Sequence, residues 1–314
     1  MGLVEAWGGN AIGWFFAHMI EAYYNFFYAI FNPGQWLSWV PTINGAMETH
    51  QKEALARFMY YGASVELFFV VLNIFLIVTV VGLFRNNVLW ACVRGLEGFA
   101  NFVGRVAAWA GLLMVLQQIV IIFMQRVFAV AEIGVGFGAT FTKDVSWWSE
   151  ELKFYNAMIV CLCAAYTFVQ GGHVRVDLVY SAISYRAKKV IDMFGSLVFM
   201  ITGTLVIWLY GWFFLWRHLV VPNPSASSSL DRLLTQSRAL RWNVETIGFS
   251  PNGFNAYFLF KVLLVVFAAM IMLQAVAFFY RSFLEWKEGE ESEGKYLDKD
   301  VLGDPTAETV AQIH

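Results

Sequence analysis

Five long apolar stretches, separated by polar and charged segments, run through this sequence of 314 residues. An α-helix needs about 20 apolar residues to cross the hydrocarbon layer of a membrane, where it satisfies its own backbone hydrogen bonds. Hydrophobic residues make up 59% of the chain and charged residues only 14%, against about a quarter in soluble domains. The sequence therefore predicts an all-α polytopic membrane protein with spans at 59–84, 106–125, 150–170, 190–216 and 254–280.

A sixth segment, 11–31, is apolar and aromatic but interrupted by His18, Glu21 and Asn25. Their spacings of three, four and seven residues place these side chains on one face of a helix. Two interpretations stay open. The segment is an interfacial amphipathic helix, or it is a spanning helix whose polar stripe faces a protein partner.

The remaining polar segments suggest three regions. Residues 1–100 form an N-terminal extension with the helix 11–31 and the span 59–84, and residues 101–284 form a core with four spans. Within 88–105, three charged residues indicate a membrane-surface helix or a helical lead-in to the next span. Residues 131–146 are expected to form a glycine-rich loop. The acidic tail 285–314 has few apolar residues, so we expect it to be disordered and cytoplasmic.

The connector at 171–189 combines a helix break with a basic cluster. Gly171-Gly172 ends the preceding span, Asp177 is placed to cap a short helix with an apolar stripe, and Lys188 and Lys189 follow. Such a helix is too short to span and suits the membrane surface. The excess of basic residues places the connector inside and the loop 217–253 outside, although that loop also carries more basic than acidic residues.

Other features limit the function classes. No Lys or Arg precedes Lys52, so no cleavable signal peptide is expected. Three cysteines near apolar runs are interpreted as reduced, and neither the charge balance nor any basic arm suggests nucleic acid as a partner.

From about residue 100 to 285, the order of motifs resembles the small membrane subunit (DctQ type) of tripartite ATP-independent periplasmic (TRAP) transporters. That family has an arginine after its first span, an aromatic and acidic start to the second, and a histidine and an aspartate before an amphipathic connector. The matching residues are Arg126, Trp147, Glu150, Glu151, His173, Asp177, Arg186 and Asp192. The extra N-terminal region and the long loop 217–253 depart from the family pattern.

This resemblance implies a scaffold, or stator, in a bacterial inner membrane. A separate large subunit with an elevator-type domain would hold the substrate and sodium sites, and a periplasmic binding protein would deliver an organic acid-like solute. Membrane lipids would be a third partner, beside the large subunit and the binding protein. No catalytic, substrate-binding, metal or cofactor site is expected in this chain, which is not an enzyme on this reading. The residues named above, with Glu66, are candidates for structural or partner contacts.

Each candidate also has a structural interpretation. Glu150 and Glu151 would lie in the first turn of a helix, where the helix dipole stabilises negative charge. His173 would bind lipid headgroups beside the glycine break. Asp192 is spaced to pair with Lys188 or Lys189. Glu66 would lie about 10 Å into its span and contact another helix. Interhelical hydrogen bonds are expected from Asn73, Gln117 and Gln118.

Two alternative functions remain at this stage. A self-contained transporter or channel would show broken helices, repeats or several charges at mid-membrane depth, and these are not evident. A redox anchor subunit with haem b or quinone would need opposed histidines within the spans, yet only His18 lies in a possible span. Motifs of nucleotide-binding, nucleophilic or metal-dependent enzymes are also not evident.

Overall fold

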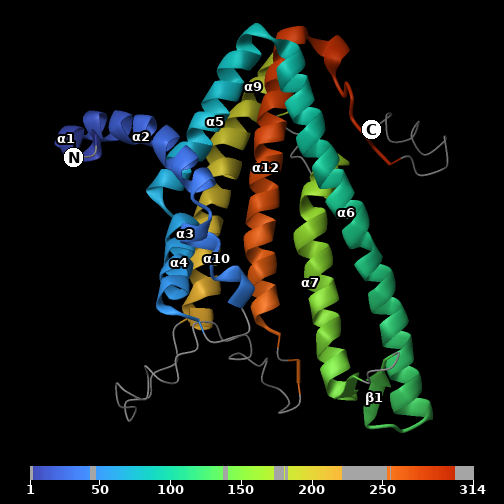
Figure 1. The fold of residues 1–314 in the computed structure, drawn as a ribbon. Coiled ribbons are helices and arrows are strands. Elements are labelled where there is room, and N and C mark those ends of the chain that lie inside the picture. The colour runs from blue at the N-terminus through green and yellow to red at the C-terminus, as the bar shows by residue number, and fades with distance from the viewer. Residues whose placement is uncertain are drawn as a thin grey trace. The chain divides into compact units, whose positions relative to one another are not determined.

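A computed structural model describes residues 3–42, 47–136, 141–172, 180, 183–220, 253–254 and 256–300. Five helices in this part of the chain are long and apolar enough to cross a membrane (Figure 1). They are α5 (Val65–Phe84), Asn86–Val127, α7 (Val145–Val169), Tyr185–Arg217 and α12 (Phe258–Glu288). The prediction of an all-α polytopic membrane protein is confirmed.

Two of these helices contain a π-helical turn. Helix α6 (Asn86–Ile122) continues into the turn η2 (Phe123–Val127), and α9 (Tyr185–Gly195) joins α10 (Thr202–Val220) through η3 (Ser196–Ile201). The chain divides into two compact units. Unit one comprises Met1–Arg85, Ile121–Glu151 and Leu205–Val265, and unit two comprises Asn86–Val120, Leu152–Thr204 and Val266–His314.

In unit one, four α-helices and a 3-10 turn precede the first candidate span, α5, in the described residues. These are α1 (Leu3–Trp7), α2 (Ala11–Phe31), α3 (Gly34–Leu37), the 3-10 turn η1 (Val40–Thr42) and α4 (Thr49–Tyr61). The predicted span 59–84 is wrong at its start, because the chain breaks after Tyr61 and Ser64 caps a new helix. The Ser64 hydroxyl accepts a hydrogen bond from the Leu67 amide at 3.1 Å, which satisfies one free donor of the first turn of α5.

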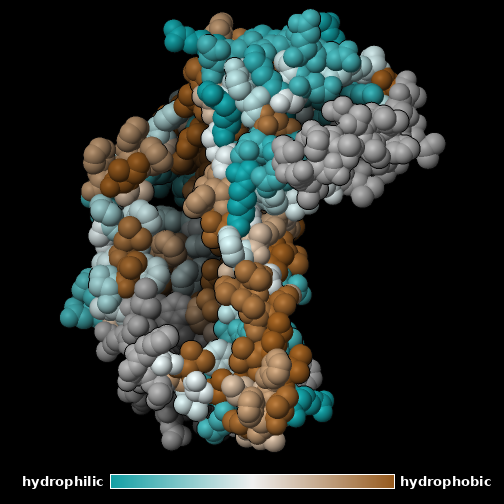
Figure 2. Space-filling model, turned by 90° about the vertical axis from the view of Figure 1, so that its right-hand side faces the viewer, coloured by the Kyte–Doolittle hydropathy of each residue, from teal (hydrophilic) through white to brown (hydrophobic). Residues whose placement is uncertain are grey.

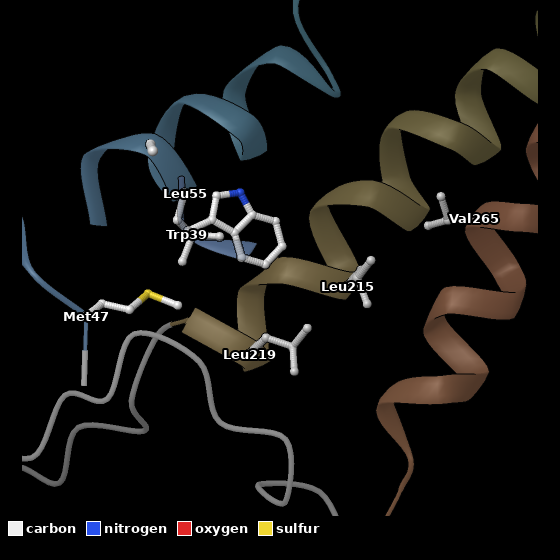
Figure 3. Packing of buried hydrophobic residues seen from close by; sticks show 7 residues of the cluster. Trp39, Met47, Leu55, Leu215, Leu219 and Val265 are labelled. Carbon is white, nitrogen blue, oxygen red and sulfur yellow. The ribbon is translucent and has the colours of Figure 1, made fainter. Parts of the chain in front are cut away.

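The core of unit one joins α4 to α10. Its buried cluster includes Trp39, Met47 and Leu55 together with Leu215, Leu219 and Val265 (Figure 3). Two indoles of α10 also bind the end of α4: Trp208 donates to the Gly62 carbonyl at 2.8 Å, and Trp212 donates to the Met59 carbonyl at 2.7 Å. These carbonyls end a helix and have no intrahelical donor, so the indoles fix the α4–α5 junction against α10.

A short hairpin replaces the loop that was expected at 131–146. Strands β1 (Glu132–Val135) and β2 (Phe141–Asp144) pair antiparallel, with Glu132 opposite Asp144 and Val135 opposite Phe141. Helix α7 follows directly at Val145, five residues before the predicted start of its span. The hairpin therefore leads straight into the second span of the predicted core.

Unit two packs helices through small residues. A Cβ at Gly104 of α6 would overlap the Tyr166 ring of α7, so the two helices approach closely at this glycine. Ala100 and Ala165 are buried in the same contact, together with Val169 and Met270. Residues 88–105 are continuous with 106–122 in α6, which confirms the interpretation of this stretch as a helical lead-in.

The predicted disorder from residue 285 is wrong for residues 285–300. Helix α12 continues to Glu288, a 3-10 turn η4 (Glu290–Ser292) follows, and residues 293–300 lie against α6 and α7. Two aspartates of this segment pair with Arg105 of α6. Residues 301–314 lie outside the described residues.

Large hydrophobic side chains remain exposed along the spans. Figure 2 shows broad hydrophobic areas over the helices and hydrophilic residues gathered toward the top of the view. On α6, Phe102 and Trp109 are each 66% exposed. Exposed apolar surface of this extent indicates contact with lipid or protein rather than water.

Candidate functional site

Four buried charged side chains join three helices of unit two, and we call them the buried ion-pair cluster: Glu97 of α6, Lys189 of α9, and Arg281 and Glu285 of α12. The Arg281 guanidinium donates two hydrogen bonds to the Glu97 carboxylate, at 2.7 and 2.6 Å. The Lys189 ammonium lies 2.6 Å from the Glu285 carboxylate. Arg281 also approaches Glu285, one helical turn away, at 3.5 Å.

The cluster is balanced in charge and closely paired. Each of its four side chains is less than 10% exposed. An unpaired charge at such a position costs several kcal/mol, whereas a bidentate arginine–carboxylate pair satisfies donors and acceptors in one fixed geometry. These contacts determine which turns of α6, α9 and α12 face one another. They give the cluster a positioning role and leave no reactive group free within it.

The C-terminal segment, residues 289–300, lies beside the cluster and is held by polar contacts. The Arg105 guanidinium of α6 binds the carboxylates of Asp298 at 3.0 Å and Asp300 at 2.6 Å. The buried Asn101 side chain donates to the Asp298 carbonyl at 2.8 Å. From α7, the Gln170 side chain accepts from the Asp300 amide at 2.9 Å, and Tyr166 donates to the Asp300 carboxylate. The segment thus bridges α6 and α7.

We expect this attachment to depend on pH. Hydrogen bonds from Arg105 lower the pKa of the Asp298 and Asp300 carboxyls below their ordinary value of 3.8. A depressed carboxyl pKa stabilises the attached state at neutral pH, and this contribution is lost as the pH falls through the lowered pKa values. Hydrogen exchange read by mass spectrometry should therefore show residues 296–300 protected at neutral pH and unprotected only below pH 3.8.

The matched variants are Arg105→Gln and Arg186→Gln. Removal of the Arg105 charge should abolish the protection of residues 296–300 even at neutral pH, whereas Arg186 is exposed and its replacement should have no effect. Unchanged protection in Arg105→Gln would show that the ionic contact does not hold the segment.

In unit one, the start of α7 brings two of the predicted residues together. Glu150 is buried, and its carboxylate accepts a hydrogen bond from the Phe254 amide at 2.7 Å. A Cβ at Gly253 would overlap this carboxylate, so the glycine permits the approach. The Trp147 ring lies 5.3 Å from that of Phe254. Because α7 begins at Val145, Glu150 and Glu151 are in its second turn, and their predicted place in the first turn is wrong.

The other predicted residues lie apart from these contacts. Glu66 is in the first turn of α5 and accepts from the Tyr60 hydroxyl at 3.3 Å, so its predicted depth of about 10 Å is wrong. Asp192 accepts from the Tyr180 hydroxyl at 2.8 Å. Of the two lysines expected as its alternative partners, Lys189 binds Glu285 and the Lys188 ammonium lies 5.3 Å from the centroid of the Tyr180 ring. Arg126 and Arg186 are exposed. His173 and Asp177 lie outside the described residues.

The buried ion-pair cluster was not recognised in the sequence. One signal was available: Arg281 and Glu285 stand four residues apart near the end of an apolar span, where ionisable residues indicate a specific partner. Of the predicted interhelical hydrogen bonds, that of Asn73 is confirmed, because its side chain donates to the Met19 carbonyl of α2 at 2.9 Å.

Among the described residues, no group of three or more His, Cys, Asp or Glu side chains is arranged to hold a metal ion. Comparisons with protein-family models, with curated proteins and with solved structures give no significant match to this chain.

Proposed function

We propose that this chain is the small scaffold subunit of a TRAP-type secondary transporter, located in a bacterial inner membrane. The observation that carries the proposal is the ordered set of residues between Arg126 and Asp192, set among five candidate spans. The large elevator-type subunit is a separate chain on this proposal, and a periplasmic binding protein delivers the organic acid-like solute. Sodium coupling would belong to the large subunit.

The packing of unit two supports a static role. A scaffold has to keep its helices in register while a neighbouring domain moves. Bidentate and buried contacts between Glu97, Arg281, Glu285 and Lys189 suit this need, because they oppose sliding of α6, α9 and α12. Charges that conduct a substrate would instead line a hydrated path. The exposed apolar faces of the spans leave surface for a membrane partner.

The test is an affinity pull-down of the full chain from gently solubilised native membranes, followed by mass spectrometry. We expect one large polytopic protein in stoichiometric amount. Recovery of the chain alone, folded and monodisperse, would contradict the proposal. A haem absorbance band in the purified sample would favour the redox alternative, and transport by the isolated chain would favour a self-contained transporter.

The exposed arginines of the motif provide variants for the same pull-down. Arg126→Ala and Arg186→Ala should reduce recovery of the large protein, because both side chains are free to contact a neighbour at a membrane boundary. Lys52→Ala is the matched control, since Lys52 is also basic and exposed but lies outside the region of resemblance. Equal recovery from all three variants would remove these arginines from the interface.

A further inference from the structure

Helix α2 turns His18 and Glu21 toward this chain's own helices and most of its aromatic residues outward. Glu21 accepts a hydrogen bond from the Val4 amide of α1 at 3.1 Å. The His18 ring stacks on the Phe69 ring of α5, with centroids 5.3 Å apart. Ala17 and Ala22 are fully buried beside them. His18 and Glu21 of the polar stripe therefore contact this chain's own helices, and a protein partner is not needed to cover these two side chains.

The outer surface of α2 is apolar over a wide arc. At about 100° per residue, nine exposed side chains lie within an arc of roughly 160° of the helix circumference. These are Ile12, Phe16, Ile20, Tyr23, Tyr24, Phe26, Phe27, Ile30 and Phe31, with exposed fractions from 38% for Phe26 to 78% for Phe31. Trp14, Phe15 and Tyr28 are also exposed but lie outside this arc. A helix with polar residues inside and a continuous apolar exterior is solvated by lipid rather than by water.

Several features favour a position along the membrane rather than across it. Tyr23 and Tyr24 lie at the middle of α2, in addition to Trp14 and Tyr28 nearer its ends, so interfacial aromatic residues run along the whole helix rather than at its two ends alone. Glu21 would stand at the centre of a crossing helix, where a carboxylate is costly. Helix α2 is not among the five candidate spans found in the described residues. In Figure 1, α2 crosses the direction of α5.

The contacts with α5 indicate how deeply α2 lies in the membrane. Phe69 and Asn73, which contact α2, lie about 6 and 12 Å along α5 from Val65. Interfacial helices bury their apolar face about 5–10 Å into the boundary between headgroups and acyl chains. If α5 enters the membrane near Val65, α2 lies at this depth in the adjacent leaflet.

We propose that α2 is a monotopic membrane helix, which lies in the lipid interface beside α5 and binds lipid through its aromatic outer surface. Its ligand is the lipid layer itself, with no requirement for anionic headgroups, because no Lys or Arg precedes Lys52. The rings of Tyr23 and Tyr24 on this surface favour the interface. This inference does not depend on the transporter assignment.

The experiment uses nitroxide labels on the full chain. Cys92, Cys161 and Cys163 are replaced by alanine, and single cysteines are introduced as Phe16→Cys, Tyr23→Cys, Phe27→Cys and Ile30→Cys, with Ala17→Cys and Ala22→Cys as inward controls. The chain is purified from its native membranes with any bound protein and placed in phosphatidylcholine vesicles. Collision rates with oxygen and with a water-soluble nickel chelate give exposure to lipid and water.

We expect oxygen collision rates severalfold higher at the four outward positions than at the two controls, with low nickel rates. Labels at residues 16 and 30 should show the same depth, whereas a crossing helix would separate them by about 21 Å. Addition of phosphatidylglycerol should leave the depths unchanged. High nickel collision rates at the outward positions would overturn the proposal by showing that they are exposed to water. Low collision rates with both reagents would show that a protein partner covers them. A gradient of depth along α2 would show that the helix crosses the membrane.

Discussion

Replacement of Arg281 by methionine is expected to lower the free energy of unfolding by about 3–5 kcal/mol. The guanidinium makes two hydrogen bonds to Glu97, and both side chains are less than 10% exposed. Its loss leaves the Glu97 carboxylate buried without its cation, and it also removes one neighbour of Glu285. The measurement is denaturant unfolding of the full chain in mixed micelles, followed by circular dichroism.

The double variant Glu97→Met with Arg281→Met separates the cost of an unpaired charge from the loss of packing. Methionine fills much of the same volume, and Glu285 keeps Lys189 at 2.6 Å. The double variant should therefore be more stable than Arg281→Met alone. An Arg281→Met cost of about 0–1 kcal/mol, the range of exposed ion pairs, would contradict the description of the cluster as buried and coupled. Arg186→Met, at an exposed site, is the matched control.

The helices were predictable because span length is a local property of the sequence. Helices α5, α7 and α12 follow apolar stretches, and the hydrogen bond of Asn73 follows from an amide within such a stretch. Boundaries were less accurate where a cap interrupted an apolar run, as at Ser64. The break before α5 also changed the interpretation of Glu66, which stands at the start of the helix rather than inside it.

The contacts that hold unit two were not predictable, because they join residues far apart in the chain. Glu97 and Arg281 are separated by 184 positions, and Arg105 and Asp300 by 195. Composition alone makes the acidic C-terminal segment look like a solvated tail. Only the fold shows that Arg105 and Asn101 face it. For the same reason, the sequence left open which side of α2 its polar stripe would face.

Replacement of Trp212 by alanine is expected to lower the free energy of unfolding by about 3 kcal/mol, the low end for a tryptophan because the ring is half-buried. The ring stacks on Trp208 at 5.6 Å and contacts Phe58 at 5.7 Å. Its indole nitrogen donates to the Met59 carbonyl at 2.7 Å. The same substitution removes the packing between α4 and α10 and a hydrogen bond at the end of α4. The measurement is again denaturant unfolding in mixed micelles, followed by circular dichroism.

Two further variants separate the contributions of ring packing and of the indole hydrogen bond to this loss of stability. Trp212→Phe keeps an aromatic ring but cannot donate, so it should cost about 1 kcal/mol. Trp109→Ala removes a tryptophan that is 66% exposed and should leave stability nearly unchanged, within about 0.5 kcal/mol. If Trp212→Ala is as mild as Trp109→Ala, α10 does not hold the α4–α5 junction. If Trp212→Phe is as severe as Trp212→Ala, the hydrogen bond to Met59 rather than ring packing holds α4 against α10.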